Sequence, residues 1–346
     1  MRLEILDGPA IAERRWIGAV LCRDVNGAGR RPLLLKGRRL VAGDAAILAG
    51  AELEELHLLW PEPGDVDEDA AATRLAQVIA GAGVEIHRPV ESQVRLSAVR
   101  RGRVRVDTAT LAALNAVDAV TVFTLPDGIP VEPGRTVAGV KVTPLTIPEP
   151  LLAEAERLAF SLSGDSRTLT VRGFLPLRLA AVVRHRISDE ARLRFERSLR
   201  ARADWFGGSV ASVDYAPSRS AAREALLRAA TAADLVLVVG VASVDPLEST
   251  WRDLLEAGAA VIRRGLPVHP GSSYWLATLA GIPVIGVASC GMLSRRSALD
   301  LLLIRCFSGE PLDPAFLAGL GHGGLLGPEQ GWRIPSYESA GEADAP

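Results

Sequence analysis

The sequence predicts an α/β protein in which a three-layer, mostly parallel sheet domain follows a smaller, β-rich α+β domain. From Leu177 onward, strand-length apolar runs alternate with amphipathic helices, which is the pattern of parallel strands covered on both faces. Residues 92–142 instead contain short β-rich stretches separated by Gly and Pro turns. A chain of 346 residues is also long enough for two domains. We place the N-terminal domain at 1–150, with room for two small subdomains, the sheet domain at 151–330 and a flexible tail at 331–346.

The N-terminal half is predicted from alternation, helix formers and turn residues. The acidic run Asp65–Asp69 suits the positive end of a helix dipole, and a cation site is the alternative for it. The Arg101-Gly102 pair predicts the turn of a hairpin, and the proline-rich stretch 144–150 predicts a linker. The expected elements are strands Leu53–Trp60, Val94–Val99, Val104–Val106, Ala119–Thr124 and Arg135–Val142, and helices Ala70–Ala80 and Leu151–Phe160.

The C-terminal half changes to a regular succession of strands and helices. Its strands are apolar almost throughout, and its first long helix has arginines on its polar face. The expected strands are Leu179–Val183, Ser209–Val213, Asp234–Val239, Ala260–Ile262 and Pro283–Val287. The expected helices are Asp189–Trp205, Ser220–Ala230, Glu248–Ala257, Tyr274–Leu279 and Arg296–Phe307.

Charge and cysteine usage exclude several classes of protein. A net charge of −2 provides no global field that would attract nucleic acid or an anionic membrane. Cys22, Cys290 and Cys306 lie far apart, so we expect no disulfide framework and no zinc knuckle, and a cytoplasmic location. No signal pattern begins the chain, and no apolar run is long enough for a membrane span. Only Lys36 and Lys141 are lysines, so Arg, backbone N–H groups and hydroxyls would have to contact any phosphate.

The first candidate ligand loop follows the strand Asp234–Val239. In parallel sheets ligands bind at the carboxyl ends of the strands, where small residues let backbone N–H groups approach an anion. Gly240 ends this strand, and Ser243 and Thr250 follow it. Asp245 and Glu248 are the only closely spaced acids at these strand ends, and two carboxylates there suit Mg²⁺ bound between protein and phosphates. The alternative is helix capping by Ser243, Asp245 or Thr250.

Two further loops have the same character. In the second, Pro270 and Gly271 precede Ser272 and Ser273, whose N–H groups and hydroxyls are expected to contact phosphate or molybdate at a helix start. His269 beside them is interpreted as incidental rather than catalytic.

The third loop follows Gly286 and contains Ser289, Cys290 and Ser294, with Arg295 and Arg296 at the start of a helix. Cys290 could be a nucleophile or a metal ligand, but no histidine adjoins it and a small buried cysteine is favoured.

In order and spacing these loops resemble those of the molybdopterin-binding domain family, which includes molybdopterin adenylyltransferases and molybdate-inserting molybdotransferases. The family's first loop, G-G-x-S-x-D/G, is matched by Gly240, Ser243, Asp245, Glu248 and Thr250. Its P-V-x-P-G loop is matched by Pro267, Val268, Pro270 and Gly271, and its third loop by Gly286, Cys290 and Ser294. The resemblance is strongest from Asp234 to Gly309 and extends to Lys36-Gly37 and Gly64-Asp65.

The resemblance implies a protein that binds molybdopterin or Mo-molybdopterin during molybdenum-cofactor biosynthesis. An active transferase would carry out Mg²⁺-assisted adenylyl or molybdate transfer on the pterin phosphate, with ATP or AMP, and with Asp245 and Glu248 as catalytic and metal-binding residues. The family also implies a homo-oligomer, a dimer or a trimer.

Departures from the family pattern keep a second hypothesis open. The T-G-x-E-like loop is replaced by Arg184–Ser188, of which Ser188 is kept as a ligand-binding candidate, and the second glycine of the first loop is Val241. A valine there hinders close backbone approach. The alternative is therefore a non-catalytic cofactor carrier or insertion chaperone that hands the cofactor to a molybdoenzyme. A third hypothesis is a nucleotide-binding α/β domain of other purpose.

Overall fold

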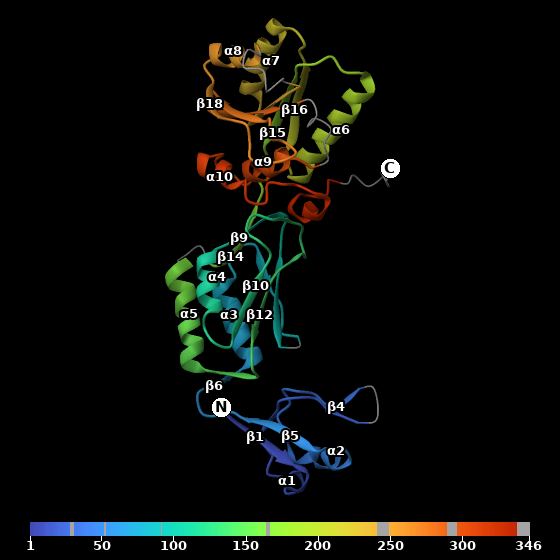
Figure 1. The fold of residues 1–346 in the computed structure, drawn as a ribbon, viewed down its shortest axis with the longest axis vertical. Coiled ribbons are helices and arrows are strands. Elements are labelled where there is room, and N and C mark those ends of the chain that lie inside the picture. Colours follow the sequence, from blue (N-terminus) through green and yellow to red (C-terminus); the bar gives the residue numbers. More distant parts are fainter. Residues whose placement is uncertain are drawn as a thin grey trace. The chain divides into compact units, whose positions relative to one another are not determined.

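The contacts within the chain define two compact units. The structure, a computed structural model, describes residues 1–27, 31–51, 53–90, 92–163, 167–240, 249–288 and 296–337. The first unit comprises Met1–Val99, Val104–Asp127 and Pro133–Val171, and the second comprises Arg100–Arg103, Gly128–Glu132 and the chain from Arg172 onward. Both units combine helices with several sheets (Figure 1), so the protein is of mixed α/β class.

The first unit begins with a three-stranded antiparallel sheet in the order β1-β5-β2. Leu6 from β1 and Leu56 and Leu58 from β5 are buried on one face, in a core with Ile11 and Trp16. The strand expected at Leu53–Trp60 is thereby confirmed as β5. The elements of this part are β1 (Arg2–Asp7), α1 (Gly8–Ala12), β2 (Val20–Leu21), β3 (Val25–Asn26), β4 (Pro32–Leu34), η1 (Ala42–Asp44), α2 (Ala45–Gly50) and β5 (Glu55–Trp60).

The rest of the first unit is built on a four-stranded antiparallel sheet in the order β10-β12-β8-β7. Helices α3 and α4 pack against its strands, and α5 packs against both helices. Because of this packing α5 belongs to the first unit, whereas the sequence placed the start of the second domain at Leu151. The elements along this stretch of chain are β6 (Asp65–Asp67), α3 (Glu68–Ile79), β7 (Val84–Ile86), β8 (Gln93–Ala98), β9 (Gly102–Val106), α4 (Thr108–Asn115), β10 (Val120–Thr124), β11 (Pro130–Val131), β12 (Thr136–Val142), β13 (Thr146–Pro148), α5 (Glu149–Ser163) and β14 (Leu169–Gly173). Of these, β11, the start of β9 and the end of β14 belong to the second unit.

Two sequence predictions in this region are wrong. The strands on either side of Arg101 do not form a hairpin, because β8 pairs with β12 and β7 while β9 pairs with β11 and β14. The stretch 144–150 is not a free linker, because β13 pairs with β6 and Ile147 is fully buried. Local alternation identifies a strand, but its partner depends on contacts from distant parts of the chain.

The acidic run Asp65–Asp69 begins helix α3. The Asp67 carboxylate accepts hydrogen bonds from the backbone N–H groups of Asp69 (3.0 Å) and Ala70 (3.3 Å), so it is the N-cap. Asp65 instead accepts a hydrogen bond from the backbone N–H of Glu62 at 2.8 Å. The helix-start interpretation of this run is therefore confirmed for Asp67.

The second unit is built on a six-stranded sheet in the order β16-β15-β17-β20-β19-β18. The strands β16, β15, β17 and β20 are parallel to one another, and β19 runs antiparallel to both β20 and β18. The elements are β15 (Arg178–Val183), α6 (Asp189–Trp205), β16 (Ser209–Tyr215), α7 (Arg219–Ala232), β17 (Leu235–Val239), α8 (Ser249–Glu256), β18 (Ala260–Arg264), β19 (Trp275–Leu279), β20 (Ile282–Val287), α9 (Ala298–Phe307), α10 (Pro314–Gly319) and η4 (Pro328–Arg333).

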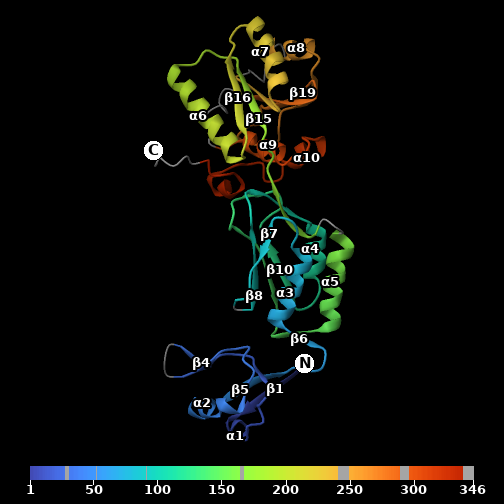
Figure 2. The same cartoon turned by 180° about the vertical axis from the view of Figure 1, so that it is seen from behind.

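Both faces of this sheet are covered by helices (Figures 1 and 2). On one face, alternate strand residues such as Leu237 and Ile285 pack with Phe195 of α6 and Leu302 of α9. On the other, the intervening residues, such as Val236, pack with α7 and α8. Because successive side chains of a strand point to opposite faces, burial on both sides requires the continuous apolar runs seen in the sequence.

The helix expected at Tyr274–Leu279 is wrong, because these residues form β19. A two-residue turn joins β19 to β20: Ala280 and Gly281 both have positive φ, 53° and 82°. This backbone conformation matches the twist of a tight antiparallel hairpin. Gly286 of β20 then lies under the Trp275 indole, where a Cβ atom would come within 1.8 Å of Trp275 Cε2. Strand pairing thus determines the structure of this segment.

None of the helices in the described parts of the chain combines the length and apolar composition needed to cross a membrane.

Candidate functional site

Three strand ends meet at one edge of the six-stranded sheet. In the parallel register Val183 is opposite Val239, and Val239 is opposite Val287. The residues that follow these strands continue the ladder: Arg184 N–H donates to the Val239 carbonyl and Gly240 N–H to the Val287 carbonyl, both at 2.9 Å. We call this edge of the sheet, formed by the ends of β15, β17 and β20, the carboxyl edge.

Gly240, at the end of β17, is constrained both by its backbone conformation and by a neighbouring side chain. Its φ is +84°, a conformation that glycine adopts without strain, and it is buried. A Cβ atom at this position would lie 2.4 Å from Cδ2 of His185, so the imidazole ring lies directly against the glycine backbone. The end of β17 is therefore specified as glycine both by its backbone conformation and by its neighbour on the β15 loop.

The loop between β18 and β19 reaches the same edge. Trp275, the first residue of β19, is opposite Gly286 of β20, near that strand's carboxyl end. Gly271 has φ +120°, and a Cβ atom there would lie 2.4 Å from the Cβ of Ala298 at the start of α9. The Pro270 carbonyl accepts a hydrogen bond from Ala298 N–H at 2.9 Å. The structure thus brings the second predicted loop against the first turn of α9, the helix that the third loop precedes.

The remaining members of the second loop differ in exposure. Ser272 is exposed and Ser273 is half-buried, so the Ser272 hydroxyl is accessible to solvent. The helix start expected there is absent from the described residues, since the loop leads into β19. His269 is also exposed, and its backbone N–H and carbonyl bond to Gly324 and Leu326. Its backbone therefore has a structural role.

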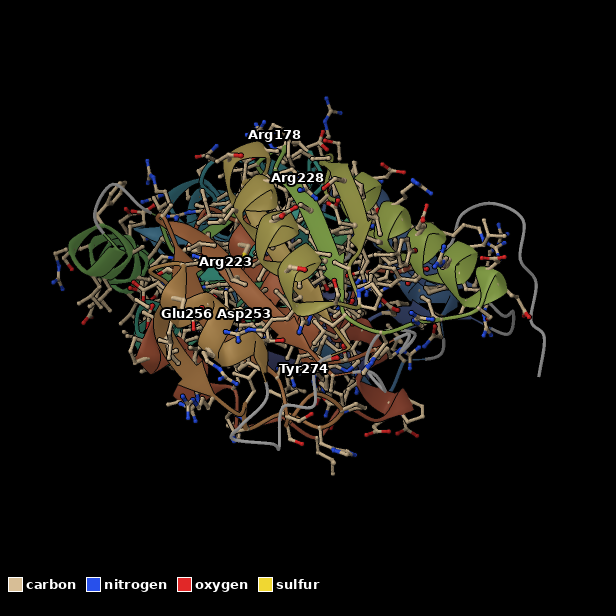
Figure 3. All side chains as sticks on the ribbon, turned by 90° about the horizontal axis from the view of Figure 1, so that it is seen from above. Arg178, Arg223, Arg228, Asp253, Glu256 and Tyr274 are labelled. Atoms are coloured by element: carbon tan, nitrogen blue, oxygen red, sulfur yellow. The ribbon has the colours of Figure 1, made fainter. Side chains whose placement is uncertain are left out.

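Two other predicted residues occupy helix positions. Ser188 is the N-cap of α6, where its hydroxyl accepts the Ala191 N–H at 3.3 Å. Thr250 lies on α8 with no exposed surface. The acid one turn further along α8, Asp253, is 1% exposed and binds Arg219 of α7 at 2.5 Å, and Glu256 binds the same arginine at 3.1 Å. Figure 3 labels Asp253 and Glu256, which lie side by side on this helix. The described residues of α8 therefore pack toward α7 and the core.

Six predicted residues fall outside the described parts of the chain: Ser243, Asp245, Glu248, Ser289, Cys290 and Ser294. Within the described parts, no cluster of three or more His, Cys, Asp or Glu side chains has a geometry that could bind a metal ion. Cys306 lies inside α9, where complete burial raises the pKa of its thiol to about 12. Burial likewise raises the pKa of Cys22.

Basic side chains are a feature of the carboxyl edge, where the sequence suggested Arg296 as a ligand contact but treated Arg184–Arg186 only as a departure from the family pattern. Arg184, His185 and Arg186 follow β15 directly, and Arg296 precedes α9. Arg192, in the first turns of α6, lies over the Tyr215 ring at 4.4 Å. The basic triplet that immediately follows an apolar strand could have indicated this feature from the sequence, because ligands of such sheets bind at the carboxyl ends of the strands.

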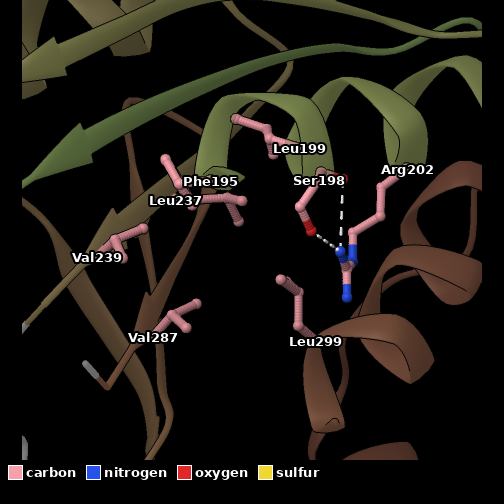
Figure 4. Close-up of a pocket in the computed structure, with 8 residues that line it drawn as sticks. All are labelled: Phe195, Ser198, Leu199, Arg202, Leu237, Val239, Val287 and Leu299. Carbon is pink, nitrogen blue, oxygen red and sulfur yellow. Dashed lines mark hydrogen bonds between the residues drawn. The ribbon is translucent and has the colours of Figure 1, made fainter. Parts of the chain in front are cut away.

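The core beneath this edge contains a cavity of about 10 Å³, which is room for one water molecule. It lies between α6, α9 and the strands β17 and β20 (Figure 4), lined by Phe195, Ser198, Leu199, Arg202, Leu237, Val239, Val287 and Leu299. Arg202 Nε donates to Asp300 Oδ1 at 2.9 Å, and the guanidinium also bonds to the Ser198 hydroxyl. The cavity is too small for an organic ligand.

Asp300 determines where α9 begins. Its carboxylate accepts the Ser297 backbone N–H at 2.9 Å while Ser297 caps the helix, which is a capping box, and both residues are fully buried. The ion pair with Arg202 therefore connects α6 to the first turn of α9. That turn contacts Gly271, so the pair also positions the loop between β18 and β19.

The edge and its sheet define an α/β protein with glycine-lined, basic strand ends. Among solved structures, a molybdopterin biosynthesis moea protein from Pyrococcus horikosii is 13% identical, over 71% of this chain and 76% of that chain, with a TM-score of 0.29. A molybdenum cofactor biosynthesis protein from Pyrococcus furiosus is 10% identical, over 90% of this chain and 66% of that chain, with a TM-score of 0.24. No protein-family model matches the chain, and a search of curated proteins found no match.

Proposed function

We propose that the second unit binds the phosphorylated pterin of molybdenum-cofactor biosynthesis, molybdopterin or Mo-molybdopterin, at the carboxyl edge. The observation that carries the proposal is Gly240. It stands at the end of a central strand with φ +84°, and the ends of β15 and β20 are its hydrogen-bonded neighbours. Because Gly240 has no side chain, donors on the neighbouring loops can lie close to this strand end, where ligands of such sheets bind.

The surroundings of Gly240 agree with an anionic ligand. Arg186 and His185 are exposed on the neighbouring loop, and Ser272 is exposed on the loop between β18 and β19. Arginine binds phosphate oxygens with two parallel hydrogen bonds, and serine hydroxyls add further donors. The sequence motifs at Gly240 and at Pro267–Gly271, which resemble those of the molybdopterin-binding domain family, supply the ligand class.

For the chemistry, we propose a carrier or insertion chaperone rather than a transferase. Thr250, which falls on the family's first motif, is fully buried on α8, and a basic loop replaces the T-G-x-E-like loop after β15. Burial keeps the Thr250 hydroxyl away from a ligand, and the basic loop lacks the polar groups of the T-G-x-E-like loop on which transfer chemistry would depend. In a transferase, Asp245 and Glu248 would hold Mg²⁺ and position the phosphates, with charge neutralisation as the main catalytic effect.

The test is a fluorescence titration of the purified protein with molybdopterin. Arg186→Ala and Gly240→Ala should each weaken binding by about tenfold or more, which corresponds to about 1.4 kcal/mol or more. Arg223→Ala is the matched control, because Arg223 is an exposed arginine on α7 and its loss changes the net charge equally. Absence of binding, or equal affinity of all variants, contradicts the proposed site.

A second measurement separates carrier from transferase. The protein is incubated with molybdopterin, Mg²⁺ and ATP, and pyrophosphate and AMP are quantified. A carrier binds the pterin and releases neither product. Turnover that is lost in Asp245→Asn would instead establish the transferase and overturn the carrier.

A further inference from the structure

Strand β1 has one edge without a partner among the described residues. It is the terminal strand of the sheet β1-β5-β2, and its full length pairs with β5 on one side, from Arg2 opposite Trp60 to Asp7 opposite Glu55 (Figures 1 and 2). An open strand edge presents a row of N–H and C=O groups that can pair with another strand. Proteins usually protect such edges, so a six-residue open edge requires an explanation.

The side chains of β1 make this edge unusually apolar on one face. Leu3 is 66% exposed and Ile5 is 59% exposed, and alternation places both on the same face of the sheet. The opposite face carries Arg2 and Glu4, of which Glu4 accepts a hydrogen bond from Trp60 Nε1 at 2.8 Å. An exposed apolar pair on an open edge strand favours strand addition.

We propose that β1 pairs antiparallel with β1 of a second copy of this chain, which forms a two-fold symmetric dimer with one continuous sheet. Directly opposed residues in an antiparallel pair lie on the same face, so a symmetric pairing must be centred on a single residue. Pairing centred on Leu3, Glu4 or Ile5 satisfies this requirement.

Charge complementarity selects one of these three registers. Centring on Leu3 places Arg2 opposite Glu4 of the second copy, twice by symmetry, and packs the two Leu3 side chains together. Centring on Glu4 places two carboxylates opposite each other, which is destabilising. Centring on Ile5 leaves Glu4 opposite Leu6 of the second copy and Leu3 opposite its Asp7. The dimer is therefore centred on Leu3.

Cysteine cross-linking tests both the surface and the register. In the dimer centred on Leu3, the two Leu3 Cβ atoms lie about 5 Å apart, whereas the two Ile5 residues are separated by four positions along the strand, about 13 Å. Mild oxidation should therefore convert Leu3→Cys to a disulfide-linked dimer. Ile5→Cys, on the same face and similarly exposed, should form no more disulfide-linked dimer than wild type does. The wild-type protein measures the cross-linking that its native cysteines produce by themselves. Equal cross-linking of the two variants, or none in either, overturns the proposal.

A charge swap followed by sedimentation provides the independent measurement. Wild type should sediment as a dimer, and Arg2→Glu should shift toward monomer because two carboxylates then face each other at each end of the pairing. The double variant Arg2→Glu/Glu4→Arg should restore the dimer, with circular dichroism showing that all three proteins are folded. A wild-type monomer at the highest soluble concentration, or a dimer unaffected by Arg2→Glu, contradicts pairing through β1.

Discussion

Single residues determine the geometry of the carboxyl edge, and Gly240 is one of the most constrained of them. A residue other than glycine with φ near +84° is destabilised by its left-handed backbone conformation. At this position its Cβ would also clash with the His185 side chain. The two costs can be separated because Gly207, at the end of α6, has φ +77° and no atom within 4 Å of a built Cβ.

We expect Gly207→Ala to lower the free energy of unfolding by about 1–2 kcal/mol, the cost of the left-handed conformation alone. Gly240→Ala should cost more, because its Cβ must displace the imidazole. Adding His185→Gly should bring the loss back to that of Gly207→Ala. Urea denaturation of the four proteins measures these differences. An equal loss in Gly240→Ala and Gly207→Ala would show that contact with His185 has no energetic role.

Glu68, at the start of α3, provides a second prediction at this scale. Its side chain accepts a 2.6 Å hydrogen bond from the Ser92 hydroxyl, and burial raises its pKa above the ordinary value of 4.5. A carboxyl with a raised pKa in the folded state stabilises the fold fully only below its unfolded pKa. That contribution is lost as the pH rises through the folded-state pKa.

Glu68→Gln stays neutral and can still accept the Ser92 hydrogen bond. We therefore expect this variant to become more stable relative to wild type as the pH rises from 4.5 toward neutrality, and to lose that advantage below 4.5. Urea denaturation at several pH values measures the difference. Glu13→Gln, at a carboxylate whose side chain is 63% exposed, is the control. A wild type that gains stability relative to Glu68→Gln with rising pH would contradict the prediction.

At the scale of elements, the ion pair between α6 and α9 has the largest predicted effect. Arg202 is 6% exposed and Asp300 is fully buried, so removal of the arginine leaves a buried carboxylate without its counter-charge. We expect Arg202→Met to lower the free energy of unfolding by about 3–5 kcal/mol. The double variant Arg202→Met/Asp300→Asn should cost less, because it buries no charge.

An exposed ion pair on the same helix is the matched control. Arg200 and Glu196 are 2.8 Å apart, but the arginine side chain is 56% exposed. Arg200→Met should therefore cost less than about 1 kcal/mol in the same urea titration. Similar losses for Arg200→Met and Arg202→Met would mean that the buried pair does not hold α6 and α9 together.

The elements also show how far periodicity alone predicts structure. Helix α6 was predicted with its observed bounds, Asp189–Trp205, because its amphipathic period with arginines on the polar face extends over the whole segment. The structure adds the Ser188 cap, which the sequence analysis had taken as a ligand-binding candidate. The segment 274–279 was mistaken for a helix because a six-residue, mostly apolar run fits either structure. Its Ala280-Gly281 turn, which requires positive φ twice, becomes recognisable only once β19 and β20 are paired.

At the scale of the whole molecule, the second unit is assembled from three separate stretches of chain. Residues 100–103 and 128–132 belong to it together with the chain from Arg172 onward. Arg103 forms an ion pair with Glu310 at 2.7 Å, with side chains 8% and 13% exposed. Arg101 donates to the Trp205 carbonyl at 2.7 Å and lies over the Trp205 ring. A cut before Arg172 removes both arginines from the unit.

We therefore expect the fragment 172–346 to be less stable than the same unit in the full chain, by at least about 3 kcal/mol. Hydrogen exchange of the β17 amides measures the stability of the unit in both proteins. Arg103→Met in the full chain should reproduce part of the loss, which separates the ion pair from the other contacts of the missing stretches. Equal protection of β17 in fragment and full chain would show that residues 100–103 and 128–132 do not stabilise the unit.

The sequence by itself determined the mixed α/β class, most helices and strands of the second unit, and the strand ends from which the candidate loops begin. These properties are local: an apolar period, a cap or a turn residue is visible within a few positions. Only the tertiary structure decided that β8 and β9 have different partners and that 144–150 contains a strand. It also determined that Ser188 caps helix α6 and that Thr250 is buried in the core. The contact of His185 with Gly240 likewise became visible only in the tertiary structure. These outcomes depend on contacts between residues far apart in the chain, which the pattern of neighbouring residues in one sequence does not reveal.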